Sequence, residues 1–291
     1  RQKLFGTLGI GAVFAINGTL TDFIGYRAQF VIVSITCLIF FVVAYFGLNG
    51  SSTQFLIHSK IKESTLENPK PAPTVSWLDN MMLLLKNLDF LLLLLIVFLI
   101  GVSGSVFNVY FSVFMGKVLA GYKWKNRVMG YMYATRLAVE VPIYIWGDVL
   151  LGMFGSYGVL LMGMAASAIR PFGYSMFVAD IYSSLWGFPF ELCKGFSHAC
   201  NGLGGCVLAS DMAPPGAQGT AQALLTSAHH HAASAFSGII CSLFLSWRNV
   251  SNVADAQQII IYRELFFWTG IVGFIGTVLN AARLIFSPKK M

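Results

Sequence analysis

Long apolar stretches, separated by short polar segments, recur along the whole chain. A helix needs about 20 apolar residues in succession to cross the hydrocarbon core of a bilayer. The fifth such stretch contains the pair Arg170-Pro171, at which we expect an interruption. By this measure the pattern predicts eight membrane spans, at residues 4–20, 28–48, 88–116, 127–150, 156–178, 186–210, 215–246 and 260–285.

One long polar segment divides these spans into a group of two and a group of six. It contains the proline-bearing stretch HSKIKESTLENPKPAP, followed by TVSWLDNMMLLLKN, which predicts an amphipathic helix at the membrane interface. With this segment in the cytoplasm, nine lysines and arginines lie inside and seven outside, as the positive-inside rule favours. We therefore expect two spans in residues 1–48, a cytoplasmic linker in 49–87 and six spans in 88–291.

The composition agrees with a chain embedded in a bilayer. Hydrophobic residues make up 56% of the 291 positions and charged residues 11%, whereas soluble domains carry about 25% charged residues. A larger core cannot account for this difference, because the buried area per residue grows slowly with chain length. The sequence therefore predicts an all-α, polytopic transmembrane helical bundle whose first partner is the lipid bilayer.

The net charge of +7 is expected on loops that face a membrane surface. The basic residues are scattered and lack the aromatic interleaving of single-strand-binding proteins, so no nucleic-acid partner is predicted. The cysteines lie in apolar stretches without metal-ligand spacing, which predicts neither disulfides nor a metal site. Histidine pairs of the kind that build intramembrane metalloenzymes are missing, and we expect no enzyme and no cofactor.

Three adjacent histidines, His229 to His231, lie near the middle of the seventh span. Adjacent residues on a regular α-helix diverge by about 100°, so the three imidazoles cannot coordinate one metal ion. Small residues around them allow a close approach of helices, which favours hydrogen bonds between helices. The alternative is a supporting part in proton transfer for His229 together with His198.

Ionisable residues inside the spans define the candidate site, because charge at membrane depth is costly and marks function. Arg136 and Glu140 are four residues apart in the fourth span, so they are neighbours on one helix face. They either neutralise each other or take part in a site. Arg170, beside a proline in the fifth span, either snorkels from a helix end or joins the same site.

The sixth span carries the strongest signal of a site. Glu191, Lys194 and His198 fall within about 60° of one another on a helix. A charged stripe on a spanning helix must face a partner helix or a water-filled cavity. We expect the residues that bind substrate or couple its movement to protons to be Arg136, Glu140, Arg170, Glu191, Lys194, His198 and His229.

The order of elements resembles a known family. Two spans, a long linker and six spans are similar to a major facilitator superfamily transporter from its fifth helix onward. The stretch QKLFGTLGIGAVF is similar to the fifth helix of the lactose-permease-like branch, and residues 127–175 resemble its helices eight and nine. FPFELCKGFSHA and APPGAQGTAQALL resemble helix ten and the start of helix eleven in the animal group called major facilitator superfamily domain-containing protein 6.

The resemblance implies a partial major facilitator fold. Residues 1–48 would be the last two helices of the N-terminal half and residues 88–291 the C-terminal half, while helices one to four of the same protein are missing. In such transporters the two halves rock about a central cavity. We do not expect transport by the present helices alone, because they enclose only half of a cavity.

The resemblance also implies roles for the charged residues. Lactose-permease-like members couple transport through a carboxylate on helix eight, an arginine on helix nine, and a histidine and a carboxylate on helix ten. Arg170 matches the arginine, whereas Glu140 lies one turn beyond the family's position, which is Leu137 here. Glu191 and His198 supply the helix-ten types in reversed order. Lys194, which lies between them, departs from the pattern of the lactose-permease-like branch.

We therefore expect a secondary active transporter that moves a small polar solute together with H+. Arg170 and Lys194 would hold Glu140 or Glu191 ionised, and protonation of that carboxylate would release the pair. His198 could share the proton, since imidazole titrates near neutral pH. The alternative is a non-transporting receptor or scaffold that retains a transporter fold. The sequence names neither the substrate nor the membrane.

Overall fold

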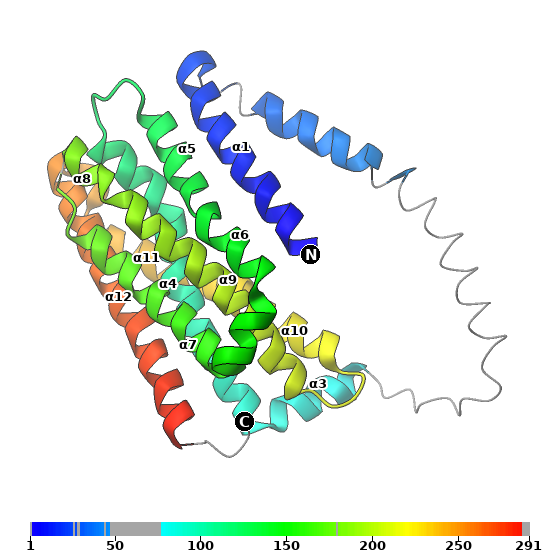
Figure 1. The fold of residues 1–291 in the computed structure, drawn as a ribbon. Coiled ribbons are helices and arrows are strands. Elements are labelled where there is room, and N and C mark those ends of the chain that lie inside the picture. Colours follow the sequence, from blue (N-terminus) through cyan, green and yellow to red (C-terminus); the bar gives the residue numbers. More distant parts are fainter. Residues whose placement is uncertain are drawn as a thin grey trace.

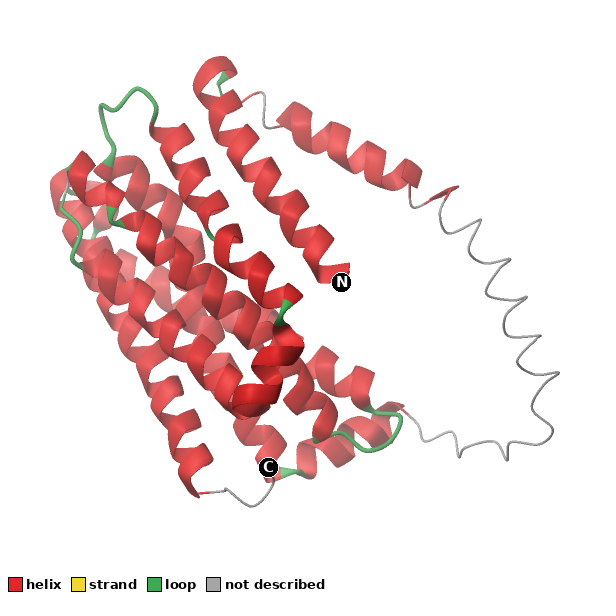
Figure 2. Cartoon of the chain, viewed as in Figure 1, coloured by secondary structure: helices red, strands yellow, loops and turns green. Residues whose placement is uncertain are grey.

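The computed structural model describes residues 2–25, 27, 30–43, 45–46, 77–178 and 180–286. In these ranges the chain is helical apart from short turns (Figure 2). The elements are α1 (Gln2–Ile24), a helix at Phe30–Val43, α3 (Trp77–Lys86), α4 (Leu88–Val118), α5 (Lys125–Thr135), α6 (Leu137–Ile145), α7 (Gly147–Ser175), α8 (Ile181–Leu185), α9 (Gly187–Asp211), α10 (Gln218–Thr226), η1 (Ser227–Ala232), α11 (Ala233–Trp247), η2 (Val250–Asn252) and α12 (Asp255–Phe286).

Three helices in the described ranges, α4, α7 and α12, are long and apolar enough to cross a membrane by length and composition. Two further predicted spans are built from shorter pieces, α5 with α6 and α10 with η1 and α11. The interfacial helix expected before the third span corresponds to α3, while residues 49–76 of the predicted linker lie outside the described residues.

The helices of the second group pack side by side into one bundle (Figure 1). α9 packs along α7, and α12 packs against both α4 and α7. An aromatic cluster that includes Phe111, Phe114 and Phe266 fills the bundle toward the end where α8 lies. A second apolar cluster, which includes Leu84 and Phe90, fills the end where α3 and α10 lie. The polar interior described below lies between these two clusters.

α1 lies against α5 and joins the two predicted parts of the chain (Figure 1). Gly18 and Gly130 face each other, and a Cβ built on Gly18 would lie 3.1 Å from the Gly130 Cα. Small residues permit such backbone contact between membrane helices. Asp22 accepts hydrogen bonds from the Asn126 side chain and the Arg127 backbone N–H, both at 2.8 Å. Asp22 therefore caps α5, whose first N–H groups have no partner within the helix.

The fourth predicted span, 127–150, is wrong as one continuous helix. It is divided at Arg136 into α5 and α6, and it ends at Ile145. Pro142 lies inside α6, where it has no N–H for the helical hydrogen bond and its ring crowds the preceding turn. Sharp bends in helices most often arise at prolines, so Pro142 is the local feature of this span best able to interrupt a straight helix.

The fifth predicted span, 156–178, is more continuous than the sequence suggests. The interruption expected at Arg170-Pro171 is wrong, because α7 continues through this pair to Ser175. The helix is bent instead at Gly155, with φ 67° and ψ 168°. Glycine adopts a positive φ without steric cost. Arg170 therefore lies in an uninterrupted helical stretch that follows Gly155, five residues before the end of α7 at Ser175.

Candidate functional site

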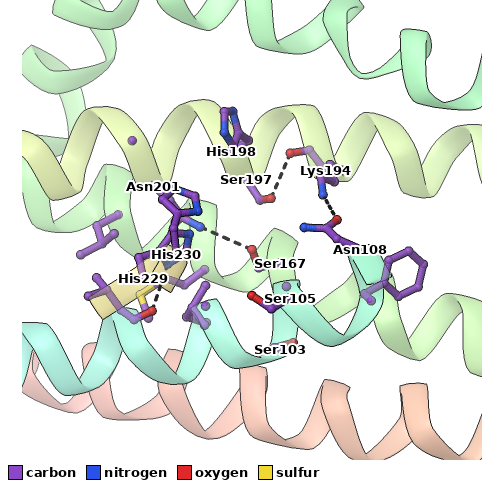
Figure 3. Close-up of a pocket in the computed structure, with 18 of the residues that line it drawn as sticks. Ser103, Ser105, Asn108, Ser167, Lys194, Ser197, His198, Asn201, His229 and His230 are labelled. Carbon is purple, nitrogen blue, oxygen red and sulfur yellow. Dashed lines mark hydrogen bonds between the residues drawn. The ribbon is translucent and has the colours of Figure 1, made fainter. Parts of the chain in front are cut away.

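A cavity of about 500 Å³ lies among α4, α6, α7, α9, α10 and η1. Its walls carry hydroxyl, amide, imidazole and amine groups beside apolar side chains (Figure 3). No carboxylate lines it among the described residues. The polar wall residues used below are Ser105, Asn108, Arg170, Lys194, His198, Asn201, His229 and His230.

Arg170 on α7 and Glu191 on α9 form a buried ion pair. The Arg170 Nη2 lies 2.5 Å and its Nε 3.0 Å from Glu191 Oε1. The Tyr174 hydroxyl donates to the same oxygen at 3.0 Å. On its other side the Arg170 guanidinium lies 3.9 Å from the centroid of the Phe107 ring, a favourable cation–π geometry. Glu191 is thus enclosed on several sides, and its side chain is 0% exposed.

Glu140 on α6 is the centre of a second charged group. The Arg136 Nε lies 3.7 Å from Glu140 Oε2, so the predicted intrahelical pair is present. His198 of α9 reaches Glu140 Oε1 with its Nδ1 at 2.9 Å. The Glu140 side chain is 1% exposed and that of His198 46%. His198 therefore connects a buried carboxylate with the cavity, which it also lines.

A glycine allows α9 to approach the division between α5 and α6. A Cβ added to Gly195 would collide with the carbonyl oxygen of Arg136. This close approach brings His198, three residues further along α9, within reach of Glu140 on α6. The two charged groups are consequently joined to the same helix, α9, at Glu191 and His198, which lie about two turns apart.

Lys194 lies between the two groups along α9 but joins neither. Its Nζ donates to the Asn108 Oδ1 of α4 (Figure 3). No carboxylate of the described residues lies within ion-pair distance of this amine. The described residues therefore show no ion pair between Lys194 and either glutamate, and the expectation that Lys194 helps to hold Glu140 or Glu191 ionised stays a prediction. Glu191, Lys194 and His198 each contact a different residue. The partners are Arg170, Asn108 and Glu140, respectively.

The three histidines lie in an element that the sequence did not predict. Residues Ser227–Ala232 form a π-helix, with i→i+5 hydrogen bonds, so the angular argument for a regular α-helix does not apply. The His229 Nδ1 donates to the Val97 carbonyl of α4 at 3.0 Å, a hydrogen bond between helices of the kind expected. His230 stacks edge-on against His229, with ring centroids 4.5 Å apart, and His231 is exposed.

Close packing of α4 accompanies the π-helix. A Cβ added to Gly101 would collide with the carbonyl oxygen of His229. π-helical turns in proteins are frequent at functional sites, and this one lies on the cavity wall. His229 and His198 both line the cavity, and their cooperation in proton transfer stays a prediction.

Asn108 and Tyr174 belong to the site and were missed by sequence reasoning. Asn108 is an amide within a strongly apolar stretch, where an uncompensated polar group is costly. Tyr174 follows Arg170 by four residues, the spacing of helical neighbours. Both signals are present in the sequence and could have been used. In the described residues no group of three or more His, Cys, Asp or Glu side chains could hold a metal ion.

The apolar helices and the charges buried between them define an integral, multi-pass membrane protein. A sequence profile described as the MFS_1 like family matches residues 1–253, and the chain belongs to that family. No curated protein is significantly similar to the chain in sequence.

The chain is similar to the crystal structure of a mutant of the nucleoside transporter NupG. The TM-score is 0.61 at 12% sequence identity, and the match covers 73% of this chain and 54% of that one. At this identity the likeness shows the fold, and the predicted all-α bundle with a partial major facilitator fold is confirmed. The chain spans about half the length of that transporter.

Proposed function

We propose that the chain belongs to a secondary active transporter that moves a small polar solute together with H+ by alternating access. The contact between His198 and Glu140 carries this proposal. His198 is half-exposed on the cavity wall, whereas Glu140 is buried 2.9 Å away. A proton that reaches the cavity can therefore pass through an imidazole, which can both accept and donate a proton, to a carboxylate without its own access to water.

The surroundings of Glu140 link proton binding to the contact between the two parts of the chain. Protonation removes the charge of Glu140 and with it the attraction to Arg136, 3.7 Å away. The Arg136 guanidinium lies 5.4 Å from the centroid of the Phe14 ring on α1. α1 packs on α5 and α6. A movement of Arg136 would therefore change the contact between α1 and these helices, which is the surface on which the two halves of such a transporter would rock.

The proposal includes a particular division of the molecule. Residues 1–48 are the last two helices of an N-terminal half, 49–87 a cytoplasmic linker and 88–291 the C-terminal half. Four further helices would complete the cavity, an arrangement supported by the 54% coverage of the related transporter. The motifs in residues 2–14 and 127–175 support the lactose-permease-like branch, and those on α9 and α10 support the group of major facilitator superfamily domain-containing protein 6.

The second ion pair has a different part in this proposal. Arg170 and Glu191 are both nearly inaccessible, and we assign them to holding α7 against α9. Glu140 and Glu191 are the two carboxylates that the proposed mechanism could use as the proton carrier. The contact of Glu191 with Tyr174 and its two bonds from Arg170 favour Glu140.

Uptake into liposomes that contain the full-length protein tests this function. Labelled neutral, anionic and cationic solutes are supplied with and without an inward pH gradient. We expect saturable uptake of at least one solute, and faster uptake when the outside is acidic. Uptake at the same rate with and without the pH gradient would contradict proton coupling. The lack of any saturable uptake would favour a receptor or scaffold.

A further inference from the structure

Among the residues that the structure describes, the basic and acidic side chains around the cavity do not balance. Arg136 lies beside Glu140, and Arg170 is bonded to Glu191. Each carboxylate thus has its own guanidinium. Lys194 remains as a third cation, with only the neutral Asn108 amide as the acceptor of its hydrogen bond in the described part of the chain.

Lys194 is one of the residues that line the cavity. It lies on the cavity wall, and its amine points toward Asn108 across the space between α9 and α4 (Figure 3). The other polar groups on this wall are hydroxyls, amides, imidazoles and the guanidinium of Arg170, which is paired with Glu191, and no described carboxylate lines the wall. Among the described residues, the cavity wall therefore carries basic groups and no acidic one.

A cation at membrane depth is costly unless another charge or water compensates it. An oxyanion in the cavity would supply that charge, and charge-assisted hydrogen bonds are about twice as strong as neutral ones. Nearby hydroxyl and amide groups, such as those of Ser105 and Asn201, could donate to the remaining oxygens. The cavity volume of about 500 Å³ suits a small solute rather than an inorganic ion alone.

We propose that the solute of this cavity is an organic anion whose carboxylate or phosphate group is held by Lys194. This inference rests on the proposed transport function and narrows its substrate class. Arg170 has a smaller part in recognition, since its guanidinium is already engaged by Glu191 and Phe107. The neutral Asn108 orients the amine toward the solute without neutralising it.

Ligands that share one scaffold but differ in charge test the proposal. The full-length protein in detergent is heated with glucose, glucosamine, glucuronate or glucose 6-phosphate, and its unfolding temperature is measured. We expect glucuronate or glucose 6-phosphate to raise this temperature by about 2 °C or more at millimolar concentration. Glucose and glucosamine should have no effect. The comparison of the two anions distinguishes a carboxylate from a phosphate.

Variants identify the amine that is responsible. Lys194→Met should abolish the effect of the anions and should raise the unfolding temperature of the protein alone, because an uncompensated cation is removed. Lys194→Arg should retain the effect, as should Lys123→Met, which removes an exposed lysine between α4 and α5. If Lys194→Met lowers the stability and no anion stabilises the protein, a carboxylate elsewhere in the protein pairs with Lys194 and the proposal is overturned.

Uptake by the same variants distinguishes this proposal from the proposed function. Saturable uptake of a neutral solute that is unchanged in Lys194→Met would overturn the anion site and leave transport intact. Stabilisation by an anion through Lys194, without uptake of any solute, would support the site and contradict transport.

Discussion

His198 on α9 and Glu140 on α6 are bonded at 2.9 Å, and only the histidine of the two reaches the cavity. The carboxylate is thus separated from water by its own partner. In the proposed mechanism, His198 is the route by which a proton reaches or leaves Glu140.

Replacing His198 with Leu should slow uptake driven by a pH gradient on the order of 100-fold, a size typical of a lost proton-transfer group. Counterflow of labelled for unlabelled solute, which needs no net proton movement, should change far less. His231→Leu is the matched control, because His231 is exposed in the same chain. Equal losses of uptake and counterflow would indicate a structural part for His198.

Arg170 and Glu191 should behave as a structural pair. Either Arg170→Met or Glu191→Leu leaves the other charge buried without a partner, at a cost of about 3–5 kcal/mol. The double variant removes both charges and should recover most of the lost stability. Thermal unfolding in detergent measures the three variants, and simple addition of the two single losses would contradict the pairing.

Two glycines on α4, three residues apart, give a test of the packing around the π-helix. Gly101→Ala would press a methyl group against the His229 carbonyl and within 2.8 Å of the Ala233 Cβ. We expect a loss of about 1–3 kcal/mol, as for other overpacked sites. Gly104→Ala meets no atom within 4 Å and should be neutral or stabilising by about 0.5–1 kcal/mol. Equal unfolding temperatures for the two variants would contradict the close contact.

Asp22 should stabilise the contact between α1 and α5. Asp22→Ala removes the acceptor of the Asn126 and Arg127 hydrogen bonds, and loss of a helix cap costs about 0.5–2 kcal/mol. A lower unfolding temperature and faster proteolysis between the two parts are expected. Asp180→Ala, an exposed aspartate between α7 and α8, is the control. If both variants unfold alike, the cap does not hold the parts together.

The sequence predicts the all-α bundle and the charged residues of its interior, because long apolar runs and costly buried charges are strong signals. Glu140, Arg170, Glu191 and His198 all lie in the interior of the bundle or on its cavity. The sequence leaves open whether Arg170 pairs with Glu140 or Glu191, and it does not indicate the contact of His198 with Glu140, since both depend on how far α9 approaches its neighbours. The contact of Gly195 with the Arg136 carbonyl decides that approach, and nothing local to Gly195 indicates it.

The π-helix at His229 was unpredictable for a related reason. Its hydrogen bonds arise in a helix that contacts α4 at Gly101 and Val97, more than a hundred residues earlier in the chain. The division at Arg136, in contrast, had a local signal in Pro142. The apolar composition of residues 127–150 nevertheless predicts one continuous span, because membrane helices often tolerate a proline without a break. Pro171 is such a proline in α7.

Proton movement coupled to the solute is the central claim, and alkalinisation measures it most directly. Liposomes with the full-length protein are placed in weakly buffered medium, and a transported solute is added outside. The account predicts that the external pH rises as solute and H+ enter together, and that Glu140→Gln abolishes this rise while counterflow continues. An unchanged external pH during solute entry into wild-type liposomes would contradict the account.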